Sequence, residues 1–168
     1  MENHLKEMLL TLAGRDVEFV VGGGVACVLH GVERVTLDLD IAVRMTPQNL
    51  GRLIDAVETL KLRPRVPVSL ADIADPQFVH SMVVEKGALV FSLTDIDNPL
   101  RHLDIFLSPH LSFERLSEDA IWFDIGPAKI RVVSRKLLIE IKREIKPLRS
   151  KDILDLEELG KTMPQPPP

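Results

Sequence analysis

The stretch between Val17 and Val43 constrains the fold more than any other part of the chain. An apolar run ends at Val21, glycines occupy positions 22–24, and a second apolar run, 37–43, contains two aspartates. Short apolar runs predict buried strands, and glycines that directly follow a strand predict a tight turn. The sequence therefore predicts a strand, a helix that begins in the glycine turn, and a second strand that carries acidic side chains.

The aspartates of the second run, Asp38 and Asp40, are expected on one face of their strand. Side chains alternate between the two faces of a strand, so Leu39 and Ile41 point to the opposite face. Two neighbouring carboxylates repel and raise each other's pKa unless a cation lies between them. Magnesium prefers carboxylate and phosphate oxygens and is the expected cation, with manganese as the alternative. The competing interpretation is that both carboxylates simply face water on a half-exposed sheet.

A later run, RHLDIFL, repeats this pattern around Asp104, whose neighbours Leu103 and Ile105 point the other way. If the two strands are adjacent, three carboxylates meet and can hold two metal ions for phosphoryl transfer. The free N–H groups at the start of a helix bind anions, so the glycine turn adds a place for phosphate. Asp38, Asp40 and Asp104 are therefore the predicted metal ligands and catalytic residues.

The remaining patterns predict one domain over residues 1–161 and a flexible proline-rich tail over 162–168. Pro64 and Pro67 predict a loop, and a break near Pro76 divides a helical region in two. The fold class expected is α/β (α+β), with a mixed, mostly antiparallel sheet, helices packed on one face, and C-terminal helices. Helices are predicted over 5–14, 22–30, 46–60, 69–86, 134–146 and 150–159, and strands over 17–21, 37–43, 88–93, 102–107, 119–124 and 129–133.

Composition and charge exclude several classes of protein. No run approaches the roughly 20 uninterrupted apolar residues of a membrane span, so no membrane association is expected. The single Cys27 excludes an internal disulfide and a cysteine zinc cluster, and it fits the reducing cytoplasm, where we expect the protein. The net charge of −4 argues against a general nucleic-acid coat, yet residues 131–151 carry +6. That segment is either a solvated helix face or a surface for a triphosphate or an RNA backbone.

Gly23-Gly24, thirteen further residues and then Asp38-Leu39-Asp40-Ile41 resemble the signature of the polymerase-beta-like nucleotidyltransferase superfamily. The fuller run GGVACVLHGVERVTLDLDI is similar to small bacterial members, including the toxin branch of abortive-infection and toxin–antitoxin systems. The resemblance extends through HLDIFL and SRKLLIEIKREIKPLRSKDILDL, and so covers about Val17 to Leu159. The positions that match in the first run are Gly23, Gly24, Ala26, Gly31, Arg34, Thr36, Asp38 and Asp40.

This resemblance implies a nucleotidyltransferase fold and a magnesium-dependent reaction. A nucleoside monophosphate would pass from a nucleoside triphosphate to a hydroxyl group of an RNA end, a protein or a small molecule, with release of pyrophosphate. Two magnesium ions are implied, and Asp104 would also activate the acceptor hydroxyl. The residues implied are Asp38, Asp40 and Asp104 for metal binding and catalysis, and Gly23, Gly24, Arg34, Thr36, Lys142 and Asp152 for nucleotide binding.

The chain departs from the resemblance at two points. Many active members carry serine where this chain has Gly24, so one hydroxyl donor to phosphate is missing. Aromatic residues make up only 4% of the chain, which leaves Trp122 and Phe123 as the candidates for stacking on a base. A second Asp-x-Asp in the run TDIDNP is predicted to be a turn.

Two questions stay open in the sequence. Arg34 and Arg149 could each neutralise charge on a transferring phosphate or pair with a carboxylate of the chain. The rival to an enzyme is a chain that keeps the fold without turnover and serves as a binding or regulatory module, as in a toxin–antitoxin pair. With 168 residues there is little room for a separate domain that binds the acceptor. We therefore expect a second copy of the chain, in a homodimer, or a partner protein to form the other wall of the acceptor site.

Overall fold

The computed structural model describes residues 3–161, and the predicted tail at 162–168 lies outside the described residues. None of the helices in this described part has the length and apolar character that a membrane crossing requires. The helices are α1 (Asn3–Gly14), α2 (Gly23–Leu29), α3 (Pro47–Thr59), α4 (Pro76–His80), α5 (Phe113–Ser117), α6 (Arg135–Glu144) and α7 (Ser150–Gly160), with short turns of helix at η1 (Leu70–Ala74), η2 (Ser81–Glu85) and η3 (Pro109–Leu111). The strands are β1 (Phe19–Val21), β2 (Asp38–Val43), β3 (Leu62–Pro64), β4 (Val90–Asp95), β5 (His102–Phe106), β6 (Ile121–Asp124) and β7 (Lys129–Val132).

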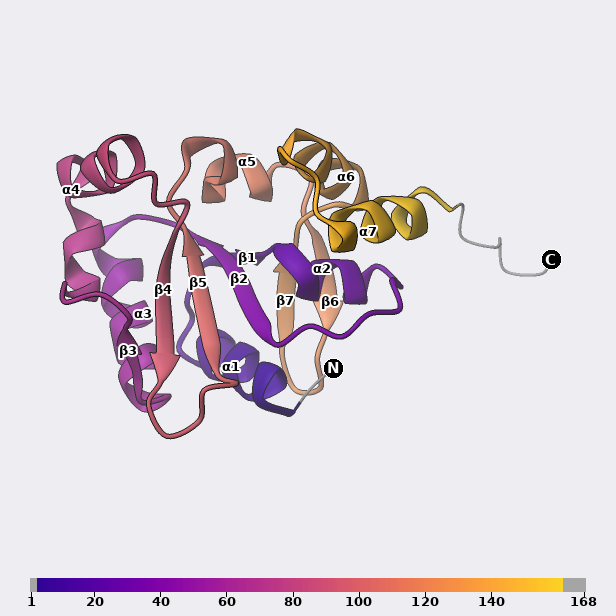
Figure 1. The fold of residues 1–168 in the computed structure, drawn as a ribbon. Helices are drawn as coiled ribbons and strands as arrows, with labels where there is room; N and C mark the ends of the chain where they lie inside the picture. Colours follow the sequence, from indigo (N-terminus) through magenta and orange to yellow (C-terminus); the bar gives the residue numbers. More distant parts are fainter. Residues whose placement is uncertain (1–2, 162–168) are drawn as a thin grey trace.

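The seven strands form one sheet in the order β3-β4-β5-β2-β1-β7-β6. Two neighbouring pairs, β2 with β5 and β1 with β7, are parallel, and the other four pairs are antiparallel. The prediction of a mixed, mostly antiparallel sheet is therefore confirmed. In Figure 1, α1 and α3 lie behind β4 and β5, and α2, α6 and α7 gather beside the β1–β7 pair.

The core lies between the sheet and the apolar stripes of its helices. Alternate positions of β4, β5 and the first four residues of β2 are fully or almost fully buried, while the positions between them are half-buried or exposed. The alternation that separates apolar from acidic residues in the sequence thus separates the two faces of the sheet. The buried members include Leu39, Ile41, Phe91, Leu93, Leu103 and Ile105 of the sheet, and Leu5, Met8, Leu9 and Leu12 of α1.

Four parts of the structure differ from the sequence-based expectation. The predicted loop around Pro64 contains strand β3, a three-residue edge strand that ends at the proline. Proline is tolerated there because an edge strand has one side free of ladder hydrogen bonds. The helical region 69–86 consists of three short pieces, with Asp75 capping the piece that starts at Pro76. Strand β4 begins at Val90 rather than residue 88, and α5 occupies a stretch for which no element was predicted.

Asn49 is a buried polar residue that joins three segments next to the central strands. Its side-chain nitrogen donates to the carbonyl oxygens of Glu18 and Arg44, each at 2.9 Å. Its side-chain oxygen accepts from the Glu18 N–H at 2.7 Å. Only 1% of the residue is exposed, so these backbone groups have little access to water. Asn49 therefore anchors the start of α3 to the approach to β1 and the end of β2.

Replacing this asparagine tests how much the fold depends on it. Asn49→Ala should lower the free energy of unfolding by about 2–4 kcal/mol, because it leaves buried backbone donors and acceptors without partners. The exposed neighbour Gln48 provides the control, since Gln48→Ala should change the same quantity by less than about 0.5 kcal/mol. Urea unfolding of both variants measures the difference, and equal stabilities would contradict the assignment.

Candidate active site

The parallel pairing of β2 and β5 brings the candidate carboxylates together. In the register, Asp40 is the direct partner of Asp104, and Asp38 is the partner of His102. Direct partners lie on the same face of a sheet, about 4.8 Å apart from strand to strand. Asp38, Asp40 and Asp104 therefore share the face opposite to the buried Leu39 and Leu103, rather than lying on opposite sides of the sheet.

The glycine turn lies directly against Asp40. The Gly22 N–H donates to the backbone oxygen of Asp40 at 2.9 Å, and Gly22 precedes the first residue of α2. Gly23 has a φ of +56°, and a Cβ at this position would lie 1.9 Å from the Asp40 carboxylate oxygen Oδ2. Both its backbone conformation and its closeness to the carboxylate require a glycine. The turn and the acidic strand are thus parts of one site.

The environment of Asp40 disfavours its charged form. Burial raises the pKa of Asp40 most, and the neighbouring charges of Asp104 and Asp38 raise it further, to about 6. A hydrogen bond from the Gly24 backbone and the charge of Lys151 act in the opposite direction and only partly compensate. A cation placed among the three carboxylates would lower this pKa, because it would favour the ionised form.

The donor set fits a magnesium ion that arrives with phosphate ligands. Within residues 3–161, no group of three or more His, Cys, Asp and Glu side chains is arranged to hold a metal by itself. Magnesium typically takes one or two carboxylates and completes its shell with waters and substrate phosphates, rather than using an all-protein cage. The oxygen-only set of Asp38, Asp40 and Asp104 beside a phosphate-sized turn matches that requirement.

Thr36 occupies the space next to Gly24. A Cβ at Gly24 would lie 2.4 Å from the Thr36 hydroxyl oxygen Oγ1 and 3.3 Å from Nη2 of Arg34. A serine at position 24 would therefore collide with the threonine, so the two side chains exclude each other. The hydroxyl group that the sequence lacks at position 24 is present at nearly the same place, on Thr36.

Behind the turn, five charged residues form an ion-pair network that joins the 32–37 loop to α6 and α7. Asp155 accepts a hydrogen bond from Nη1 of Arg34 and forms an ion pair with Nζ of Lys142, each at 2.7 Å. Asp152 lies 3.4 Å from Lys142 Nζ and accepts two hydrogen bonds from the side chain of Arg149, the shorter at 2.6 Å. Burial alone would raise the pKa of Asp152, but Arg149 and Lys142 outweigh it and lower the pKa to about 2. Asp152 is therefore ionised, and both aspartates are paired with cations.

In this network Arg34 and Arg149 each pair with a carboxylate, which is one of the two roles that the sequence left open for them. The predicted nucleotide contacts Lys142 and Asp152 are buried members of the network, with 5% and 0% exposure. Lys151 is exposed, and its positive charge lowers the pKa of Asp40. The sequence patterns did not identify Lys151 as a site residue.

Asp155 was also not selected from the sequence, although a periodic signal was present. The buried positions of α7 are Asp152, Asp155 and Leu159, at the i, i+3 and i+7 spacing of an apolar stripe. Acidic residues at two positions of such a stripe indicate buried carboxylates that need cationic partners. Their cationic partners lie outside α7: Lys142 is on α6, Arg34 is in the 32–37 loop, and Arg149 directly precedes α7.

The aromatic candidates lie away from the carboxylates. Trp122 and Phe123 are on β6, which is separated from β2 by β1 and β7. Trp122 is 60% exposed and lies under the Arg131 guanidinium, while Phe123 packs edge-on against His30 with ring centroids 5.7 Å apart. The second Asp-x-Asp is a turn, as predicted, in which Asp95 accepts from the N–H groups of residues 97 and 98.

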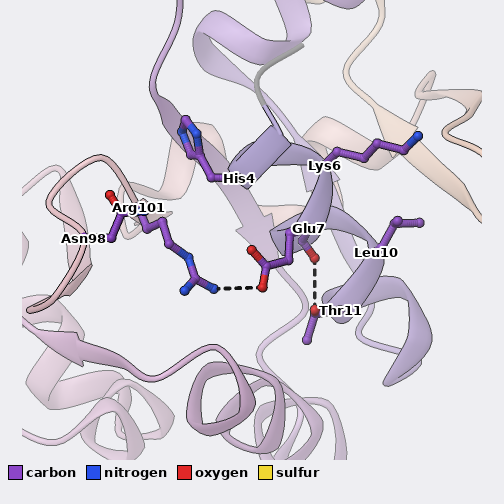
Figure 2. Close-up of a pocket in the computed structure, with 7 residues that line it drawn as sticks. All are labelled: His4, Lys6, Glu7, Leu10, Thr11, Asn98 and Arg101. Atoms are coloured by element: carbon purple, nitrogen blue, oxygen red, sulfur yellow. Dashed lines mark hydrogen bonds and ion pairs between the residues drawn. The ribbon is translucent and has the colours of Figure 1, made fainter.

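Two cavities lie outside the carboxylate cluster. One of about 830 Å³ is lined by α1 and by Asn98 and Arg101 of the β4–β5 turn. Figure 2 shows the Arg101 guanidinium paired with Glu7 across it, and none of the candidate site residues contributes to its lining. The other, of about 670 Å³, lies between the 32–35 loop and α7 and includes Arg34 and Lys151. The second cavity is therefore the one that adjoins the glycine turn and the ion-pair network.

Three solved structures share this arrangement of strands and helices. The lincosamide antibiotic adenylyltransferase LnuA, in a lincomycin-bound crystal structure, superposes with a TM-score of 0.63 at 16% identity, covering 95% of this chain and 96% of its own. The antibiotic-resistance factor ANT(2'')-Ia gives 0.56 at 17% identity and covers 93% of this chain and 80% of its own. An antigenic nucleotidyltransferase-like protein from Paracoccidioides brasiliensis gives 0.56 at 16% identity, with 94% and 76% covered.

These similarities confirm the nucleotidyltransferase fold that the resemblance implied. At 16–17% identity they extend to the fold alone, and the toxin–antitoxin branch stays a prediction. No protein-family model matches the chain, and no curated protein matches it significantly.

The raised pKa of Asp40 predicts a pH-dependent stability. An acid whose pKa is higher in the folded than in the unfolded state stabilises the fold when protonated, and this contribution is lost as the pH rises through the folded value of about 6. Asp40→Asn should therefore be more stable than the parent by about 1–3 kcal/mol near neutral pH in chelator, and the gap should close below about pH 4. Urea unfolding across this range measures it.

The exposed Asp97, whose charge is not among those that raise the pKa of Asp40, supplies the control, since Asp97→Asn should show a much smaller gap at every pH. A gap for Asp40→Asn that does not change with pH would contradict the electrostatic origin.

Proposed function

We propose that this protein transfers a nucleoside monophosphate from a nucleoside triphosphate to a hydroxyl acceptor and releases pyrophosphate. The observation that carries the proposal is the register of β2 and β5, which places Asp40 beside Asp104 and next to the glycine turn. Three carboxylates on one face and a helix start that can bind phosphate are the parts that such a reaction needs. The confirmed fold supports the same conclusion.

In the proposed reaction, the acceptor oxygen forms a bond to the α-phosphorus. The bond from that phosphorus to the oxygen that bridges to the β-phosphate breaks, and pyrophosphate leaves with the electron pair. Asp104 takes the proton of the acceptor hydroxyl, while Asp38 and Asp40 complete the oxygen ligands for divalent cations. Those cations, magnesium or manganese, supply charge neutralisation of the phosphates when bound.

The triphosphate is proposed to lie along the glycine turn. The backbone N–H of Gly23 and the hydroxyl of Thr36 are proposed as donors at that place, and the Gly24 N–H, which donates to the Asp40 carboxylate in the free protein, lies beside them. Arg34 is fixed next to them by its ion pair with Asp155. Lys142 and Asp152 act indirectly, because their pairing holds the start of α7 in position.

Lys151 is proposed as the lysine that contacts the triphosphate. It stands at the start of α7, is exposed, and contributes a positive charge at Asp40. It also lines the cavity of about 670 Å³, whose size suits a nucleoside. Val35 and Leu154, which are 77% and 60% exposed, are the apolar side chains of that cavity and would contact the base in place of an aromatic ring.

A transfer assay tests the proposed reaction. Each of the four labelled triphosphates is offered with magnesium to a mixture of cellular acceptors. Asp40→Asn and Asp104→Asn should each lower label transfer by more than about 100-fold, because each removes a charge that acts on the reacting phosphate. The control is Asp97→Asn in the β4–β5 turn, which should retain transfer within about twofold. Transfer that survives Asp40→Asn would contradict the mechanism.

Variants of Lys151 and Lys142, on neighbouring helices, distinguish a nucleotide contact from a structural role. Lys151→Met should weaken triphosphate binding about tenfold and leave the urea midpoint unchanged, because an exposed cation is lost. Lys142→Met should lower the free energy of unfolding by about 3–5 kcal/mol, because it leaves Asp152 and Asp155 short of a buried partner. Nucleotide titration and urea unfolding check the pair. A stable Lys142→Met protein with lost triphosphate affinity would reverse the assignment.

The second candidate is a fold that binds nucleotide or a partner without turnover, including a component of a toxin–antitoxin pair. The observation that favours it is the lack, within residues 3–161, of a three-residue metal cluster formed without ligand. Triphosphate binding with no transfer by the parent protein would select this candidate. A cytoplasmic location is proposed for both, consistent with the buried free thiol of Cys27, whose pKa burial raises to about 11.

A further inference from the structure

The face of the sheet that carries the carboxylates continues beyond them to the edge strand β3. Figure 1 shows β4 and β5 with no helix crossing in front of them. The register across these strands defines which side chains share that face. It can be followed strand by strand, starting from the two aspartates of β2.

One row starts at Asp38. Its partner on β5 is His102, the partner of His102 on β4 is Thr94, and the partner of Thr94 on β3 is Arg63. The second row starts at Asp40, which pairs with Asp104 on β5, and Asp104 pairs with Ser92 on β4. Beyond β3, the Arg65 N–H donates to the Ser92 carbonyl at 3.0 Å, so Arg65 continues this row.

From the outer edge inward, both rows begin at an arginine and pass through a hydroxyl group; the first then continues through His102 to Asp38, and the second through Asp104 to Asp40. Thr94, Ser92 and His102 are half-buried, while Arg63 and Arg65 are exposed. Neither arginine forms an ion pair with a carboxylate in the part of the chain that the structure describes. Exposed guanidinium groups without ion pairs, next to half-buried hydroxyl groups, can bind a polar ligand.

The charges on the outer part of this face, along β3 and β4, select against a cationic group at that edge. Along β3, β4 and β5 as described, Asp104 is the one acidic residue on the face, and the outer edge carries two arginines. A polyamine-like antibiotic would meet like charge at that edge. An anion would meet guanidinium groups in the geometry that they use for phosphate.

We infer that the acceptor is a phosphate-bearing hydroxyl compound, which places its hydroxyl at Asp104 and its phosphate over Arg63 and Arg65. Strand β3 lies two strands from β5, so hydroxyl and phosphate are about 10 Å apart. Ser92 and Thr94 lie between them and donate to the connecting sugar or its oxygens. This inference rests on the proposed function, since it names the class of acceptor for that reaction.

Three fluorescent probes test the class of acceptor by direct binding without nucleotide. They are a short single-stranded oligoribonucleotide with a free 3′-hydroxyl, a sugar phosphate and a cationic aminocyclitol. The full chain should bind at least one of the two phosphate probes more tightly than the aminocyclitol. Preference for the oligonucleotide identifies a nucleic-acid end as the source of the phosphate, and preference for the sugar phosphate identifies a small metabolite. Tighter binding of the aminocyclitol overturns the inference.

Charge reversal locates the binding surface. The double variant Arg63→Glu with Arg65→Glu should weaken binding of the phosphate probe at least about tenfold and, for the oligonucleotide, reduce the salt slope of the affinity by about 1.4. The matched control, Lys136→Glu with Arg143→Glu, makes the same change of charge at exposed positions of α6 and should leave binding nearly unchanged. Equal losses in both variants, or a larger loss in the control, overturn the inference.

Separate readouts distinguish this inference from the proposed function. Both double variants should keep the urea midpoint of the parent and its affinity for a fluorescent triphosphate analogue, because Arg63 and Arg65 lie away from the glycine turn. The milder pair Arg63→Gln with Arg65→Gln should give a smaller loss of phosphate-probe binding in the same direction. A parent protein that does not bind the triphosphate analogue contradicts the proposed function, whereas loss of that affinity in the arginine variants alone contradicts the acceptor surface.

Discussion

The parallel register of β2 and β5 is the constraint on which the rest of the site depends. A shift of one residue would turn Asp104 into the core and move Leu103 or Ile105 to the open face. The cost of burying an unpaired carboxylate makes that alternative unfavourable. The buried apolar side chains of β2 and β5 therefore fix the register, and the register brings Asp40 next to Asp104. The site is a consequence of how the core packs.

Holding the carboxylates together creates an electrostatic cost that the surroundings only partly reduce. Asp40 keeps a raised pKa although Gly24 and Lys151 both act to lower it. The cations Arg34 and Lys142 are instead paired with Asp155 in the ion-pair network, which connects the C-terminal helices to the 32–37 loop. A site with this unrelieved repulsion is prepared for cations and phosphates, since binding them removes a penalty that the free protein carries.

The sequence was sufficient for features that depend on local pattern. Period-two alternation predicted the shared face of Asp38 and Asp40, and the glycines predicted the strand-to-helix turn. It was not sufficient for β3, whose three residues and terminal proline carry too little pattern. It also did not predict that Lys142 is buried, because its partners Asp152 and Asp155 lie on another helix and become neighbours only when α6 and α7 pack together. The parts of the site that the sequence predicted depend on local pattern. The parts that it did not predict depend on contacts between residues that are far apart in the chain.

The close approach of Gly24 and Thr36 links two positions that are distant in the sequence. Because the threonine hydroxyl fills the space that a side chain at position 24 would need, the two positions cannot drift independently. A side chain at position 24 therefore requires that the Thr36 hydroxyl rotate away or be absent. Each of the two positions thus restricts the substitutions open to the other, and the hydroxyl beside the phosphate turn can change its origin between them while remaining in place.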